Sequence, residues 1–178
     1  MTTNQHLATQ IRQGFTLLEM LIVVSLVGIL AAVALQKLLW YQGQAEKSAM
    51  EYTATMIKSA LWMESANLMM ANRGNEVVAL AERNPINLLA EKPANYLGEV
   101  DSDNIEELAN GNWVYDVRHR QLSYLVSHKT YFKPKQGGNY LVRYKIHVLY
   151  GEIEITYGKH EKYVAGVTLK LQSGYDWQ

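Results

Sequence analysis

The sequence predicts an α+β fold, in which one long N-terminal helix packs on an antiparallel meander of about four to five strands. An apolar run over residues 15–35 leads into a helical pattern with apolar residues every three or four positions. From Asn112 the period changes to that of strands joined by short links, which is typical of an antiparallel meander. The apolar face of such a sheet needs a cover, and the amphipathic part of the helix is the candidate.

Composition limits the classes of function. The chain has no cysteine, so disulfides, thiolate metal sites and a cysteine nucleophile are excluded. It carries 17 basic and 17 acidic residues, and this balance argues against a nucleic-acid partner, even though basic residues alternate with tyrosines around residues 129–145. No catalytic motif or glycine-rich phosphate loop is present. We therefore expect neither an enzyme nor a bound cofactor.

The first 35 residues predict a leader followed by a membrane span. Residues 1–14 form a polar leader whose one formal charge is Arg12, and charge bias keeps such a leader in the cytoplasm. Residues 15–35 would form a helix of about 31 Å, which matches the hydrocarbon core of a bilayer. Residues 36–178 would then form a domain on the other side of the membrane.

Two other interpretations of this stretch stay open. Ala32-Val33-Ala34 resembles a signal peptidase site, so cleavage after Ala34 would release a secreted β-rich binding domain beginning at Leu35. Alternatively, the span stays uncleaved and anchors a binding domain to the membrane. Glu19 argues against a plain signal sequence, because a carboxylate weakens an apolar core segment and needs a partner within a membrane.

Glu19 has a local explanation and a functional one. Thr16 lies three residues before it, which is the spacing of a capping box at a helix N-terminus. The functional explanation is a pair with a positive group, such as a newly exposed N-terminal amine. The first explanation concerns only helix stability, whereas the second would make Glu19 an assembly residue.

Residues 36–73 predict an amphipathic half-helix, with Gly74 as its stop. We expect its methionines to fill the core. The expected apolar face consists of Leu38, Ala45, Ala49, Tyr52, Met56, Ala60 and Met63. The expected polar side consists of Lys37, Glu46, Lys47, Glu51, Lys58 and Glu64.

Residues 74–111 are expected to be mostly irregular, with short helices at 75–83 and before Gly111. Asp101, Asp103 and Glu106 are weak candidates for a calcium site, because oxygen-rich loops hold this ion. However, Ile105 breaks the EF-hand spacing, and Asp103 fits the cap of a short helix better.

The antiparallel sheet is expected over residues 112–172. Gly151 and Gly158 are expected in turns between strands. The expected strands cover 113–117, 122–126, 140–150, 153–157 and 164–171.

The run from Gln13 to Val24, QGFTLLEMLIVV, resembles the processing site of type IV pilins and type II secretion pseudopilins. The resemblance implies a pilin-like fold, cleavage after Gly14 by a prepilin peptidase in the membrane, and methylation of the new amine of Phe15. It also implies that Glu19 pairs with the Phe15 amine of a neighbouring subunit, with Thr16 in the same assembly motif. The implied partners are other pilin or pseudopilin subunits and an assembly platform in the inner membrane.

This resemblance implies a structural subunit that is inserted once in the bacterial inner membrane, with the C-terminal domain in the periplasm and later in a pilus or pseudopilus. Three features depart from common family patterns. Gln36 stands where many members have a proline, no cysteine pair closes a C-terminal loop, and Asp176 is the only aspartate near the C-terminus. The last two features favour a minor or accessory subunit.

Overall fold

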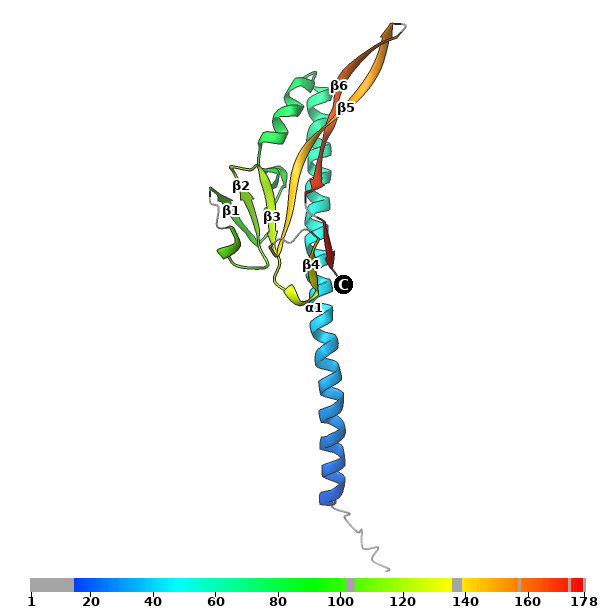
Figure 1. The fold of residues 1–178 in the computed structure, drawn as a ribbon, viewed down its shortest axis with the longest axis vertical. Helices are drawn as coiled ribbons and strands as arrows, with labels where there is room; N and C mark the ends of the chain where they lie inside the picture. The colour runs from blue at the N-terminus through cyan, green and yellow to red at the C-terminus, as the bar shows by residue number, and fades with distance from the viewer. Residues whose placement is uncertain (1–14, 102–104, 136–138, 157, 173, 178) are drawn as a thin grey trace, which may run out of the picture. The chain divides into compact units, whose positions relative to one another are not determined.

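The computed structural model describes residues 15–101, 105–135, 139–156, 158–172 and 174–177. The chain divides into two compact units, residues 1–40 and 41–178, which are described separately. The helix α1 (Leu17–Met70) begins in the first unit and enters the second, and it is helical through Gln36. In the second unit α1 packs on a mostly antiparallel sheet, which confirms the predicted α+β class (Figure 1).

Local signals explain both ends of α1. At the start, the backbone N–H of Glu19 donates to Oγ1 of Thr16 at 3.2 Å, so Thr16 caps the helix, but the Glu19 side chain does not complete the predicted capping box among the described residues. At the end, Asn72 adopts a left-handed conformation with φ of 59°. Its N–H bonds the carbonyl of Met69, and the N–H of Arg73 bonds the carbonyl of Leu68, which is a Schellman motif. Asn72, rather than Gly74, therefore ends the helix.

Residues 74–111 are more regular than expected. They contain the 3₁₀ helices η1 (Gly74–Glu82), η2 (Pro85–Leu88) and η3 (Ile105–Glu107). They also contain a strand, β1 (Tyr96–Val100), which pairs in parallel with the next strand. Gly98 lies within β1 with φ of +111°, at a position where the register with β2 is irregular. This irregularity explains why the sequence pattern did not predict a strand here.

The main sheet has five strands in the order β1-β2-β3-β5-β6, and only its β1–β2 pair is parallel. Its other strands are β2 (Trp113–Asp116), β3 (Gln121–Leu125), β5 (Leu141–Thr156) and β6 (Lys159–Leu171). A separate two-stranded sheet pairs β4 (Phe132–Pro134), which follows η4 (Lys129–Tyr131), with β7 (Tyr175–Trp177). The sheets thus extend beyond residues 112–172 at both ends.

Gly151 lies inside a strand and not in a turn, contrary to the sequence prediction. The strand β5 continues through it to Thr156, where a turn containing Gly158 leads into β6. Gly151 pairs with Tyr163, and a Cβ atom on Gly151 would lie 2.5 Å from the Tyr163 ring. The glycine therefore makes room for an aromatic ring that lies across the strand.

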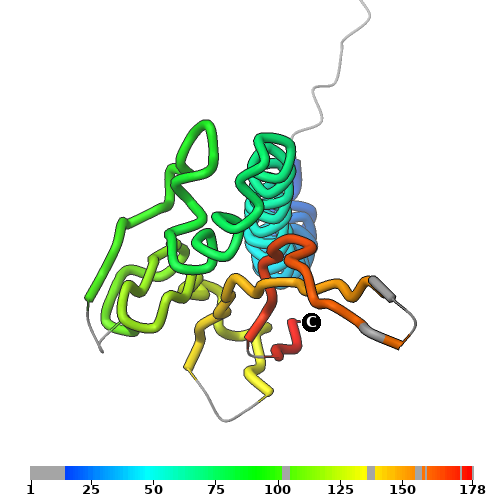
Figure 2. The backbone as a smooth tube through the Cα atoms, turned by 90° about the horizontal axis from the view of Figure 1, so that it is seen from above, coloured from blue at the N-terminus to red at the C-terminus, as the bar shows by residue number. Residues whose placement is uncertain are grey.

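Two clusters of buried side chains lie on opposite faces of the sheet. The larger cluster joins α1 and η1 to the sheet and includes Met50, Ile57, Leu61, Val77, Trp113, Leu122, Tyr124, Val142 and Leu169. In Figure 2 the strands lie to one side of the cyan part of α1. The smaller cluster joins Ile105 of η3 to Val114, Leu125 and Leu141 on the other face. The sheet is therefore the middle layer of the second unit.

Candidate processing and assembly site

Of the two predicted processing residues, Phe15 is described by the structure, whereas Gly14 lies outside the described residues. Phe15 and Thr16 precede α1, and the large apolar side chains from residue 15 to residue 35 are all exposed. In the described part of the chain, α1 is the one helix that is long and apolar enough to cross a membrane. The exposed apolar surface is what a helix surrounded by lipid or by other helices requires.

The carboxylate of Glu19 lies within this apolar surface. The cap hydrogen bond uses the backbone N–H of Glu19 and leaves the side chain unengaged. Among the described residues, no hydrogen bond or ion pair involves this carboxylate. An unpaired carboxylate is costly in hydrocarbon, so its surroundings in a membrane or an assembly must supply a partner.

The buried face of α1 in the second unit differs from the predicted one. The buried residues are Gly43, Met50, Ala54, Ile57, Leu61, Ser65 and Leu68. The predicted face has the same spacing but is offset by five residues, which is about 140° around a helix. Tyr52 is 67% exposed and Met63 is 60% exposed, so the predicted face is wrong. The methionines of this half-helix were expected to fill the core, but only Met50 is buried, whereas Met56, Met63, Met69 and Met70 are exposed.

The predicted face, apart from Leu38, belongs instead to an uncharged stripe on the outer side of α1 that continues to Met70. We define the uncharged stripe as Ala45, Ala49, Tyr52, Met56, Ala60, Met63 and Met70; only Ala60 is half-buried and the rest are exposed. The charged residues between positions 45 and 70 all lie within about 90° of the middle of the buried face. They are Glu46, Lys47, Glu51, Lys58 and Glu64. The side of α1 that faces away from the sheet thus carries no charge.

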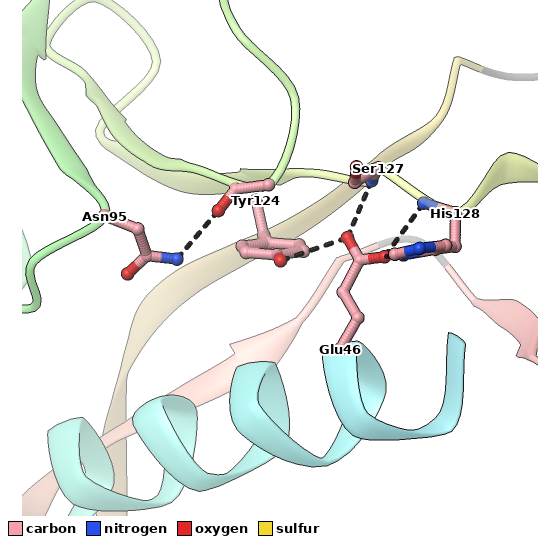
Figure 3. A network of polar contacts seen from close by, with 6 residues as sticks. Glu46, Asn95, Tyr124, Ser127 and His128 are labelled. Carbon is pink, nitrogen blue, oxygen red and sulfur yellow. Dashed lines mark hydrogen bonds and ion pairs between the residues drawn. The ribbon is translucent and has the colours of Figure 1, made fainter. Parts of the chain in front are cut away.

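Glu46 anchors the segment before η4 to α1 (Figure 3). Its Oε1 accepts hydrogen bonds from the Tyr124 hydroxyl at 3.1 Å and the Ser127 N–H at 2.6 Å. Its Oε2 accepts the His128 N–H at 2.8 Å and lies 2.6 Å from His128 Nδ1. The Glu46 side chain is only 7% exposed, so its assignment to the polar side was wrong.

This anchor also affects Tyr124. Burial raises the pKa of the Tyr124 hydroxyl well above its usual range, and the negative charge of Glu46 adds to the effect. The hydroxyl therefore stays protonated and donates to the carboxylate. Nearby, the Tyr131 ring approaches Gly43, where a Cβ atom would lie 3.2 Å from Tyr131 Cδ2. These contacts fix the loop after β3 against the first turns of α1 in the second unit.

The weak calcium candidates do not come together as a site in the described part of the chain. Asp101 forms an ion pair with Arg118, whose Nε lies 2.5 Å from Oδ1, and Asp103 lies outside the described residues. Glu106 lines a cavity of about 370 Å³ together with Asp116 and Arg143. Asp116, however, is engaged by His119 at 2.7 Å. No group of three or more metal-ligating side chains was found among the described residues.

The basic and aromatic residues around position 129 make internal contacts. Lys129 lies 5.1 Å from the centroid of the Tyr140 ring. Phe132 packs edge-on against Trp177 of the neighbouring strand, with the centroids 5.2 Å apart. The second pair links the two strands of the small β4–β7 sheet, and the first links η4 to the segment before β5.

Comparison with known proteins identifies one feature of this chain. Residues 10–35 match the family model described as the prokaryotic N-terminal methylation motif. No curated protein and no solved structure matches the chain. The matched residues include Gly14, Phe15, Thr16 and Glu19 and the whole apolar run over residues 15–35. The chain therefore carries the N-terminal signal motif of type IV pilins and pseudopilins.

Proposed function

We propose that this protein is a structural subunit of a type IV pilus or a type II secretion filament. A prepilin peptidase would remove residues 1–14 and methylate the amine of Phe15. Residues 15–35 would hold the subunit in the inner membrane with its N-terminus in the cytoplasm, and residues 36–178 would form the periplasmic domain. An inner-membrane assembly platform would then move the subunit into the filament. Proteins with this motif are structural subunits and not enzymes.

The observation that carries this proposal, beside the motif, is the uncharged stripe on α1. A helix that packs one face on its own domain normally exposes charged residues on the other face. Here the exposed face has alanines, tyrosine and methionines, while the charges flank the buried face. Apolar surface of this kind is typical of an interaction site. Helices of other subunits would cover it in a filament.

Glu19 would direct this packing. A carboxylate and an amine are each costly in an apolar environment, and pairing between the Glu19 side chain of one subunit and the Phe15 amine of another offsets much of both costs. The described residues offer Glu19 no partner within its own chain. The pair would also set the axial offset between neighbouring helices.

Substitution of Glu19 tests this role without disturbing the helix cap. Glu19→Ala and Glu19→Gln both keep the backbone N–H that bonds Thr16, so the helix should form and insert as before. Because an unpaired amine would remain in the packed helices, we expect at least about a tenfold loss of filament incorporation. Sheared filaments and membranes are quantified by immunoblot. Unchanged incorporation of both variants would refute the role of Glu19.

A photo-crosslinking residue in place of Tyr52 tests the stripe. Tyr52 is exposed, so the change should not affect folding. We expect crosslinks to other filament subunits in cells that assemble filaments, and their loss when Glu19→Ala is added. A Tyr52 crosslinker that captures no subunit in assembled filaments would contradict the proposal.

We further propose that the subunit is a minor or accessory one. The absence of cysteine and the single aspartate near the C-terminus support this, since major subunits often use a disulfide or calcium in that region. Quantitative mass spectrometry of purified filaments tests it. We expect this chain at a small fraction of the copy number of the most abundant subunit, and an equal or greater copy number would contradict this.

A further inference from the structure

The stretch of α1 directly after the apolar run carries an isolated positive charge. Lys37 is the one charged residue between Glu19 and Glu46 in the sequence. Residues 33–40 are helical and exposed, and in the described part of the chain no hydrogen bond or ion pair involves the Lys37 side chain. Contacts within the chain therefore do not explain this cation.

Lys37 lines a hollow on one face of the helix. The hollow has a volume of about 320 Å³, and it is lined by Val33, Gln36, Lys37 and Trp40. These four positions have the spacing i, i+3, i+4 and i+7, so they share one face of α1. The Gln36 amide, the Lys37 ammonium and the Trp40 indole all carry N–H donors, whereas Val33 is apolar. Donors beside an apolar side chain suit a ligand with an anionic head and an apolar tail.

The place of the hollow along α1 indicates where it meets such a ligand. The apolar run ends at Leu35, and Lys37 and Trp40 lie about 3 Å and about 8 Å further along the helix axis. When residues 15–35 span the hydrocarbon core, these two side chains lie in or next to the headgroup layer, which is about 5–7 Å thick on each side. A lysine can extend its ammonium group to the phosphates there, and tryptophan is enriched at this level.

We propose that Gln36, Lys37 and Trp40 bind the phosphate of an anionic phospholipid in the periplasmic leaflet, with its acyl chains against Val33. The positive charge of Lys37 complements that of the phosphate, and the nearest acidic residue in the sequence is nine positions away. The inference rests on the proposed function, because it requires residues 15–35 to span the membrane.

A lipid bound in this way would fix the depth of the span. With Lys37 held at the phosphates, Glu19 lies about 27 Å away along the helix axis, within the hydrocarbon core near its opposite edge. Gln36 lets the helix transmit this position, because α1 continues through it without a break. The lipid contact would thus hold the carboxylate at one depth before assembly.

Lipids with brominated acyl chains test the site, because bromine quenches only the tryptophans that it contacts. The full chain is placed in phosphatidylcholine vesicles that contain brominated phosphatidylglycerol or, at the same mole fraction, brominated phosphatidylcholine. A Trp62→Phe background removes an exposed tryptophan, and adding Trp40→Phe gives the signal of the buried Trp113 and Trp177 for subtraction. We expect brominated phosphatidylglycerol to be enriched about fivefold at Trp40 over brominated phosphatidylcholine.

Variants of Lys37 show whether its charge causes the enrichment. Lys37→Gln should abolish it and Lys37→Arg should keep it, whereas Lys58→Gln, at an exposed cation further along α1, should have no effect. An enrichment that survives Lys37→Gln would overturn the proposal. Inorganic phosphate should lower the enrichment no more than chloride does at equal ionic strength. A larger fall with phosphate would assign the hollow to free phosphate and overturn the lipid site.

The same measurement separates this inference from the proposed function. Equal quenching of Trp40 by the two brominated lipids overturns the phosphate site and leaves the membrane span of the proposed subunit standing. If neither lipid quenches Trp40, residues 15–35 do not bring it to the bilayer, and both proposals are overturned.

Discussion

Replacing Glu46 should destabilise the second unit more than replacing any other glutamate on α1. The Glu46 carboxylate accepts the Tyr124 hydroxyl and the N–H groups of Ser127 and His128, and it contacts the His128 ring, while only 7% of the side chain is exposed. Hydrogen bonds to a charged group contribute about 1.5–3 kcal/mol each, although such contributions are not additive. We therefore expect Glu46→Ala to lower the free energy of unfolding by about 3–5 kcal/mol.

Glu46→Gln separates shape from charge at this position. The amide keeps one acceptor oxygen but turns an NH₂ group toward a donor, so we expect a smaller loss of about 1.5–3 kcal/mol. Glu51→Ala is the matched control, because Glu51 is exposed and accepts one hydrogen bond of 3.3 Å from Tyr175. It should cost less than about 1 kcal/mol.

The assay is urea unfolding of the full chain in detergent, followed by the fluorescence of the buried residues Trp113 and Trp177. A Glu46→Ala variant within about 0.5 kcal/mol of the unchanged chain would refute the role of Glu46 as an anchor. Equal losses for Glu46→Ala and Glu51→Ala would refute it as well, because they would reflect helix charge and not the buried contacts.

Two further predictions concern the end of α1 and the core. Asn72→Ala should cost about 1 kcal/mol in urea unfolding, because φ at this position is +59°, whereas Asn72→Gly should be neutral or stabilising; equal effects would contradict the left-handed cap. Burial raises the pKa of Tyr144 to about 12 from its ordinary value of 10.0, so its stabilising contribution is complete below pH 10 and is lost as the pH rises through 12. Over this interval the free energy of unfolding of the unchanged chain should fall by about 2–3 kcal/mol more than that of the Tyr144→Phe variant. Parallel pH profiles of the two chains would contradict this.

The N-terminal features could be predicted because their signals are local. The three-residue spacing of Thr16 and Glu19 is enough to indicate a cap, and the cap hydrogen bond is present. The length of the apolar run likewise indicates the helix. The predicted end of α1, at Gly74, is two residues too late, because Asn72 adopts the left-handed conformation that was expected of the glycine.

The face of α1 that packs on the sheet could not be predicted from periodicity. The buried face and the predicted face have the same spacing and are offset by five residues. Each face carries four large apolar side chains, so their number does not distinguish the two. Periodicity detects an apolar face but does not say whether the same chain or another one covers it.

Long-range contacts account for the other differences. Glu46 was predicted to be a surface residue because its partners lie 78–82 positions later in the chain. Two of them are backbone N–H groups, which cannot be identified from the sequence. The strand β1 was missed because it contains Gly98, and a glycine within a short segment does not indicate a strand. Gly151 was predicted to lie in a turn because glycine is common in turns. It stands in a strand because the Tyr163 ring lies across it.

The most direct test of the account is the intact mass and N-terminal sequence of the protein purified from membranes of cells with an active prepilin peptidase. We expect the chain to begin at Phe15 with a methylated amine, as the motif at residues 10–35 implies. A chain that begins at Leu35 would instead be a secreted soluble domain. A chain that begins at Met1 would be a plain membrane anchor, and either result would contradict the proposed filament subunit.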